Sequence, residues 1–138
     1  MDDMYRELIL EHHKYPHNAG TLAKPTVSHE ETNPLCGDRI RIDLAIESGI
    51  ITDVRFTGRG CAISQASASL LTDELKGKSL DDVRALTKDD LLDLIGIPLA
   101  HNPVRIKCAL LSLKTLKAGV YEYLGAQLED EDAGDTFE

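Results

Sequence analysis

Hydrophobic and polar residues alternate along two neighbouring segments near the middle of the chain. Residues 39–46 and 50–57 both follow this pattern, and Glu47-Ser48-Gly49 separates them. Alternation with a period of two is typical of strands that bury one face, so we predict two antiparallel strands joined by a tight turn. Residues 26–32 alternate more weakly, and we expect them to add a third strand at the edge of the sheet.

On both sides of these strands the hydrophobic residues recur at helical spacing. We predict a first helix over residues 2–15, which Pro16 stops, and a second that Ser64 caps and Gly77 stops. Capping boxes at 79–82 and 87–90 each open a short helix. The last predicted helix covers residues 104–124. Strands early and helices late indicate an α+β fold. We expect a small antiparallel three-stranded sheet packed against helices.

The length and charge of the chain fit one compact domain with an acidic end. A chain of 138 residues, 42% of them hydrophobic, can fill a single core, which we assign to residues 1–125. The net charge is -9, and residues 129–138 hold six of the 24 acidic residues, which leaves 18 acidic against 15 basic residues elsewhere. We expect residues 126–138 to be disordered, and the charge argues against nucleic acid or an anionic membrane as partner.

Three cysteines are the main candidates for chemistry. The first residues lack the basic and apolar regions of a secretory signal, and no apolar run approaches membrane-spanning length, so we expect a cytoplasmic protein. In that reducing compartment an odd number of thiols indicates ligands or nucleophiles better than a disulfide framework. Cysteines are also common as small buried hydrophobic residues, but three in similar settings make that interpretation weak.

Each cysteine falls at the end of a predicted element. Cys36 precedes the first strand of the hairpin, Cys61 lies between its second strand and a helix, and Cys108 lies in the first turns of the last helix. Because a hairpin returns the chain to its starting edge, Cys36 and Cys61 should be neighbours. A helix N-terminus also favours an anionic ligand near Cys61. We therefore predict that the three thiols meet at one exposed site at one end of the sheet.

Asp38 is the natural fourth ligand of this site. It stands two residues from Cys36, and alternate side chains of an extended segment point the same way. Gly37 and Gly60 leave room for the backbone to approach a bulky anionic group. Three thiolates and one carboxylate could hold zinc or a small iron–sulfur cluster, and the hard oxygen ligand predicts a site that exchanges its cargo readily.

Three ordered motifs make the sequence similar to the IscU/SufU/NifU-type iron–sulfur cluster assembly scaffold proteins. They are the segments 33–38 (Asn-Pro-Leu-Cys-Gly-Asp), 60–69 (Gly-Cys-Ala-Ile-Ser-Gln-Ala-Ser-Ala-Ser) and 104–108 (Val-Arg-Ile-Lys-Cys), which follow an opening helix ending in Tyr-Pro-His-Asn-Ala-Gly at 15–20. The resemblance covers nearly the whole chain except its acidic end. It implies a scaffold that receives sulfur from a cysteine desulfurase and iron, builds a transient [2Fe-2S] cluster and transfers it to apo iron–sulfur acceptor proteins.

The resemblance also implies which residues bind the cargo. Cys36, Asp38, Cys61 and Cys108 match the cluster or zinc ligands of the family. Lys107 stands where IscU-type proteins have a histidine, which resembles the SufU-type branch, whereas the stretch between Cys61 and Cys108 looks too short for the usual SufU-type insertion. The motif that docks an Hsp70-type chaperone is matched only in part by residues 102–105, which leaves that partner open.

Two functional hypotheses follow. A scaffold, which is not an enzyme, would assemble and release a cluster; a zinc-dependent sulfurtransferase would hold zinc in the isolated protein and accept persulfide sulfur from a desulfurase. The possible persulfide acceptors are the three cysteines. Among the histidines, His13 and His17 have the spacing of a helical metal pair, but Pro16 should end the helix between them, so we expect a polar surface role. His12 has no partner visible in the sequence.

Overall fold

The computed structural model of the chain describes residues 2–33, 37–95 and 103–135, with the side chains of residues 7, 9–33, 37–95 and 106–125. Three strands form one antiparallel sheet in the order β1-β2-β3. They are β1 (Val27–Asn33), β2 (Asp38–Glu47) and β3 (Ile50–Arg59). All three predicted strands are therefore confirmed, including the weakly alternating one, and the α+β class with it.

A two-residue turn closes the hairpin between β2 and β3. Glu47 pairs with Ile50, so only Ser48 and Gly49 connect the strands, and their φ angles are 54° and 78°. Two positive φ angles in succession suit the right-handed twist of the flanking strands, which is why glycine is favoured there. The turn fixes the register, and the ladder then runs without a break from Ala45 to the pair of Arg39 with Arg59.

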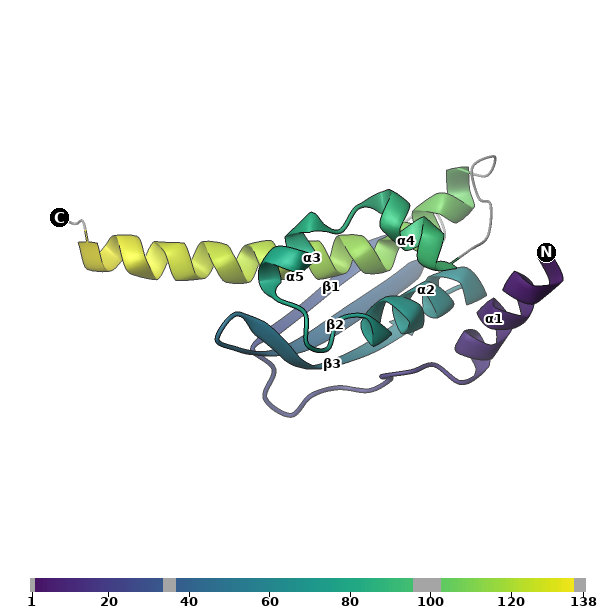
Figure 1. Cartoon of the computed structure of the whole chain (residues 1–138), viewed down its shortest axis with the longest axis horizontal. Coiled ribbons are helices and arrows are strands. Elements are labelled where there is room, and N and C mark those ends of the chain that lie inside the picture. Colours follow the sequence, from purple (N-terminus) through teal and green to yellow (C-terminus); the bar gives the residue numbers. More distant parts are fainter. Residues whose placement is uncertain (1, 34–36, 96–102, 136–138) are drawn as a thin grey trace.

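One face of the sheet carries the core. The side chains of Ile40, Ile42 and Leu44 alternate with polar residues along β2 and are almost completely buried. Two helices, α2 (Ala62–Asp73) and α5 (Pro103–Asp135), pack on the sheet, and α1 (Asp2–Lys14) packs against α2. Figure 1 shows α5 lying along the sheet with α2 beside it. Burial of this apolar face is the main contribution to the stability of the fold.

The two short helices begin where the capping boxes predict. In α3 (Leu80–Ala85), the Ser79 hydroxyl accepts a hydrogen bond from the Asp82 N–H, and the Asp82 carboxylate accepts one from the Ser79 N–H. Thr87 and Asp90 exchange the same pair of bonds at the start of α4 (Lys88–Ile95). Each pair satisfies two N–H groups that a helix terminus leaves without intrahelical partners.

The start of α2 differs from the prediction. Its N-cap is Cys61 rather than Ser64, and the Ser64 hydroxyl, inside the first turn, donates to the Cys61 carbonyl at 3.0 Å. Serine inside a first turn can bond back to a preceding carbonyl, so its presence does not fix the boundary. The helix therefore begins directly at the cysteine.

The last helix is longer than its hydrophobic pattern. We expected helix over residues 104–124 and a disordered end over 126–138, whereas α5 begins at Pro103 and continues to Asp135. Proline fits the first position of a helix because its missing N–H is not needed there. Once a helix has nucleated, each further residue adds a hydrogen bond at small cost, so α5 continues beyond its buried turns. In the described part of the chain no helix is long and apolar enough to cross a membrane.

Candidate functional site

Asp38 and Cys61 lie at the same end of the sheet. Asp38 is the first residue of β2, and the β2–β3 ladder ends at the pair of Arg39 with Arg59. One residue, Gly60, then separates β3 from Cys61 at the N-cap of α2. The hairpin register alone brings the two side chains to one corner, as the sequence predicts.

A direct pair of hydrogen bonds joins the two residues. The Cys61 N–H donates to Oδ1 of Asp38 at 3.0 Å, and the Cys61 thiol donates to Oδ2 at 3.5 Å. The carboxylate therefore satisfies an N–H at the beginning of α2, where the helix dipole favours negative charge. Asp38 is 1% exposed, so this bonding offsets part of the cost of burying it.

Gly60 makes this contact possible. Its φ is +146°, which residues with a side chain rarely adopt, and a Cβ built there would overlap the Asp38 carboxylate. Gly37, with φ of +71°, has open space where its Cβ would stand, and its N–H donates to the Asn33 carbonyl at 2.8 Å. The two glycines differ: Gly37 serves the turn, and Gly60 gives space to the carboxylate.

Cys108 reaches the same corner from α5. One ligand atom each from Asp38, Cys61 and Cys108 lie within 4.8 Å of one another. Two sulfurs and a carboxylate oxygen are a donor set that zinc or an iron–sulfur cluster accepts. A strand, a helix N-terminus and the last helix thus each supply one of the three donors.

The exposure of this cluster is lower than predicted. Cys61 is exposed, but Cys108 is 4% exposed and Asp38 is 1% exposed, so the prediction of an exposed site is wrong for these two residues. Asp38 shares the core-facing side of β2 with Ile40, because alternate residues of a strand face the same way. Cys108 stands beside the buried Ala109 on α5. Of the three described donor residues, only Cys61 is exposed to solvent.

Other predicted site residues divide between described and undescribed positions. Cys36 lies outside the described residues, and its role as a ligand stays a prediction. Lys107 is exposed on α5 next to Cys108.

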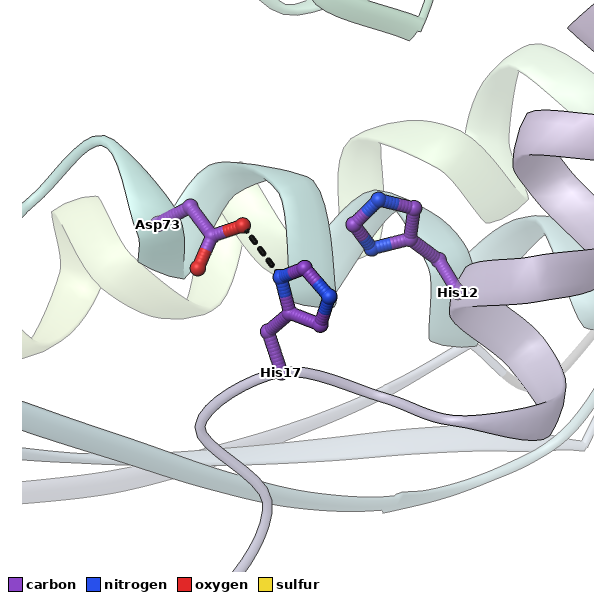
Figure 2. A group of neighbouring side chains, drawn as sticks. All are labelled: His12, His17 and Asp73. Atoms are coloured by element: carbon purple, nitrogen blue, oxygen red, sulfur yellow. Dashed lines mark hydrogen bonds and ion pairs between the residues drawn. The ribbon is translucent and has the colours of Figure 1, made fainter.

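A second cluster, which the sequence analysis missed, lies at the other end of α2. His12, His17 and Asp73 each offer a ligand atom within 4.8 Å of the others. Figure 2 shows the three side chains next to one another. His17 is exposed, as expected, and its Nδ1 lies 2.6 Å from Asp73 Oδ2. Asp73 is 56 residues away in sequence, so no local spacing could have indicated the cluster. The one local signal was Pro16, which keeps His17 out of α1.

Known proteins resemble the chain over most of its length. Residues 4–130 match the family of NifU-like N-terminal domains. The chain is 38% identical over 135 residues to the zinc-dependent sulfurtransferase SufU of Bacillus subtilis (strain 168), with 87% of this chain and 91% of that protein covered. It is 33% identical over 123 residues to the iron–sulfur cluster assembly scaffold protein IscU of Escherichia coli (strain K12), with 86% and 93% covered.

A solved structure supports the fold. The N-terminal part of a nitrogen-fixing NifU-like protein from Brucella abortus superposes with a TM-score of 0.78 at 23% identity, covering 90% of this chain and 96% of that one. At this identity the likeness shows the fold alone. Together the matches confirm the family resemblance that the three cysteine motifs indicate.

Proposed function

The chain belongs to the family of NifU-like N-terminal domains, and from this premise we propose that it is a scaffold for iron–sulfur cluster assembly. It receives sulfur from a cysteine desulfurase together with iron, builds a transient [2Fe-2S] cluster and transfers the cluster to apo-proteins. The cluster is cargo rather than a resident cofactor. A relative 33% identical to the chain is named a scaffold of this kind.

The convergence of Asp38, Cys61 and Cys108 within 4.8 Å carries the proposal. A [2Fe-2S] cluster needs four ligands, and thiolates are the usual ones. In the proposal Cys36, two residues before Asp38 in the sequence, is the fourth ligand. The donors come from separate elements, so small shifts of β2, α2 and α5 can change the distances between them.

Asp38 suits a site that must release what it binds. A carboxylate oxygen is a harder ligand than sulfur and binds soft metal centres less tightly. It also has a second partner, because Oδ1 already accepts the Cys61 N–H at 3.0 Å. When the cargo leaves, the carboxylate keeps this hydrogen bond and is not left buried without a partner. The exchange therefore costs less than it would for a ligand with no alternative contact.

Sulfur enters by thiol–persulfide exchange. A thiolate of the scaffold attacks the outer sulfur of the desulfurase persulfide; a new S–S bond forms, the old one breaks, and the desulfurase cysteine leaves as a thiolate. Of the two described cysteines, Cys61 is exposed and can meet a partner without rearrangement, whereas Cys108 is buried.

A second candidate function is a zinc-dependent sulfurtransferase. A relative 38% identical to the chain carries that name, and Lys107 stands next to Cys108 where IscU-type proteins have histidine. Lysine offers no neutral ring nitrogen to a cluster. In this reading Cys36, Asp38, Cys61 and Cys108 hold zinc, whose positive charge keeps the thiols deprotonated until one accepts sulfur.

Anaerobic reconstitution tests the two functions. The protein is incubated with ferrous iron, cysteine and a desulfurase, and visible absorption is followed while mass spectrometry monitors persulfide. The scaffold predicts iron–sulfur absorption in the wild type and its loss in Cys61→Ala. Thr57→Ala is the matched control, because Thr57 is exposed near the end of β3.

The alternative gives a different pattern. A persulfide on one cysteine, with zinc retained and no iron–sulfur absorption, would contradict the scaffold and support the sulfurtransferase. Metal analysis of freshly purified protein adds an independent readout, since a sulfurtransferase of this kind should contain close to one zinc per chain.

A further inference from the structure

The C-terminal end of α2 holds a compact group of nitrogen and oxygen donors. His12 belongs to α1, His17 follows that helix, and Asp73 is the last residue of α2. One ligand atom from each lies within 4.8 Å of the other two, and the two imidazole centroids are 4.4 Å apart. Figure 2 shows both rings and the carboxylate gathered on one side of α2.

His12 is held in place before any ligand arrives. It is 5% exposed, and its Nδ1 lies 2.6 Å from the hydroxyl of Ser69, which is itself fully buried. The same hydroxyl accepts a hydrogen bond from the His17 N–H at 2.7 Å. Burial and the neighbouring His17 lower the pKa of His12, while Asp73 and Glu11 act in the opposite direction. A neutral imidazole is the form that binds metal ions.

His17 and Asp73 are the adjustable half of the group. Their side chains are 49% and 42% exposed, and Nδ1 of His17 lies 2.6 Å from Oδ2 of Asp73. The amide of Asn18 donates to the other oxygen, Oδ1, at 3.0 Å. The Ser69 hydroxyl beside His12 and the Asn18 amide beside Asp73 resemble the hydrogen-bond partners that orient histidine and carboxylate ligands at metal sites.

We propose that His12, His17 and Asp73 form a second metal site, which binds a divalent transition metal ion of the zinc class. Two imidazoles and one carboxylate are a common ligand set for zinc, with a water in the fourth position. Tetrahedral coordination at bonds of about 2.1 Å separates neighbouring ligand atoms by about 3.4 Å. Rotation of the His17 and Asp73 side chains brings the most widely separated ligand atoms to this distance. The hydrogen bond between His17 and Asp73 breaks when the ion binds between them.

This site is separate from the cysteine cluster. Cys61 and Asp73 stand at opposite ends of α2, which at 1.5 Å per residue places them roughly 18 Å apart. The donors also differ, because nitrogen and oxygen suit Zn²⁺, Co²⁺ or Ni²⁺, whereas the hard cations Mg²⁺ and Ca²⁺ prefer oxygen alone. An ion bound here would join α1 and the segment after it to α2, stabilising a contact distant in sequence.

Cobalt titration of the full-length protein tests the proposal. The protein is stripped of metal with a chelator and titrated anaerobically with Co²⁺, whose sulfur-to-cobalt absorption reports thiolate binding separately from nitrogen and oxygen binding. We expect His17→Ala and Asp73→Asn to bind one equivalent fewer than the wild type, with the sulfur-to-cobalt band unchanged. His13→Ala is the matched control, because His13 is an exposed histidine of the same helix outside the group.

A second measurement needs no variant. Histidine ¹⁵N spectra of the wild type with added Zn²⁺ should show shifts at the ring nitrogens of His12 and His17 and none at His13, and a large excess of Mg²⁺ should not reverse them. Equal cobalt stoichiometry in the wild type and both variants, or zinc spectra without shifts at His12 and His17, would overturn the proposal and leave the group as a hydrogen-bonded contact between α1 and α2.

Discussion

The two ends of α2 carry different chemistry on the same helix. At its beginning, Cys61 meets Asp38 and Cys108 in a cluster of sulfur and oxygen that is mostly buried. At its end, Asp73 meets His12 and His17 in a cluster of nitrogen and oxygen that is mostly exposed. A single helix can therefore present two donor sets of different softness, separated by its own length.

The difference lies in what holds each cluster together. The beginning of α2 is tied to the sheet, because the β2–β3 ladder ends one residue pair before Asp38 and Gly60. At the end of α2 the cluster is held by side-chain hydrogen bonds to α1 and to the segment that follows it. The most important are those of the Ser69 hydroxyl with His12 and His17. We therefore expect the cysteine end to respond sharply to backbone changes and the histidine end to respond to side-chain changes.

Gly60→Ala should have the largest effect of all. A Cβ at this position would overlap the Asp38 carboxylate, and a φ of +146° is strained for alanine. To relieve the overlap the backbone between β3 and α2 has to move, and Cys61 moves with it, so we expect cluster assembly to be lost and stability to fall by about 1–3 kcal/mol. Reconstitution absorbance and urea unfolding measure the two effects.

The matched control for that change is Gly125→Ala. Gly125 lies in α5 with nothing within 4 Å of its Cβ position. Alanine in a helix is favoured over glycine by about 1 kcal/mol, so this variant should be as stable as the wild type or more so, with normal cluster assembly. Normal assembly in Gly60→Ala as well would show that assembly does not require the observed backbone position of Cys61.

Ser69→Ala should have the next largest effect, at the histidine end. The change removes the hydroxyl that lies against His12 Nδ1 and accepts the His17 N–H. Loss of an outer partner typically weakens metal binding by about 10–100-fold, and two polar groups left unpaired cost about 1–3 kcal/mol of stability. Zinc titration calorimetry and urea unfolding in the presence of a chelator measure these effects.

Ser67→Ala controls for the loss of a buried hydroxyl in α2. Ser67 is fully buried, and its hydroxyl donates only to the Ile63 carbonyl within the same helix. Its removal leaves no polar group of the histidine cluster without a partner, so zinc affinity should stay at the wild-type value. An equal loss of affinity in both serine variants would mean that Ser69 acts through packing and not through His12.

Much of the cysteine end could be predicted from the sequence. Alternating residues gave the hairpin, and the hairpin brought Asp38 next to Cys61 without any tertiary information. The approach of Cys108 was predicted only from its place in the first turns of a helix, because nothing local fixes where α5 crosses the sheet. The burial of Asp38 and Cys108 was missed, since alternation tells which residues share a face but not how closely a helix covers that face.

The histidine end could not be predicted in the same way. Its contacts join residues 12–17 to residues 69–73, and they depend on how α1 packs against α2. Hydrophobic spacing predicts that such helices exist, but it does not give the rotation that turns His12 towards Ser69. Asn18 adds a φ of 61°, which the sequence indicates only as a turn after Pro16.

Asp38→Ala tests whether the carboxylate makes the cysteine end labile. We expect slower release of the cluster to an apo-protein, on the order of tenfold, which corresponds to about 1.4 kcal/mol. Asp38→Asn keeps an oxygen that can accept the Cys61 N–H, so its rate of cluster release should lie between those of the wild type and Asp38→Ala. The transfer rate is followed by the change in visible absorption on mixing with an apo-ferredoxin, and faster release in Asp38→Ala would contradict the lability argument.

Ser79→Ala should have the smallest effect, because Ser79 belongs to neither donor set. It removes a capping box at the start of α3, where the Ser79 hydroxyl accepts the Asp82 N–H. Loss of such a cap costs about 1 kcal/mol, measurable by urea unfolding. Cluster assembly and zinc affinity should both stay at wild-type values, because no residue of α3 belongs to either donor set. If zinc affinity fell with stability here, the histidine end would be responding to the stability of the whole fold, and the loss in Ser69→Ala could no longer be attributed to the position of His12.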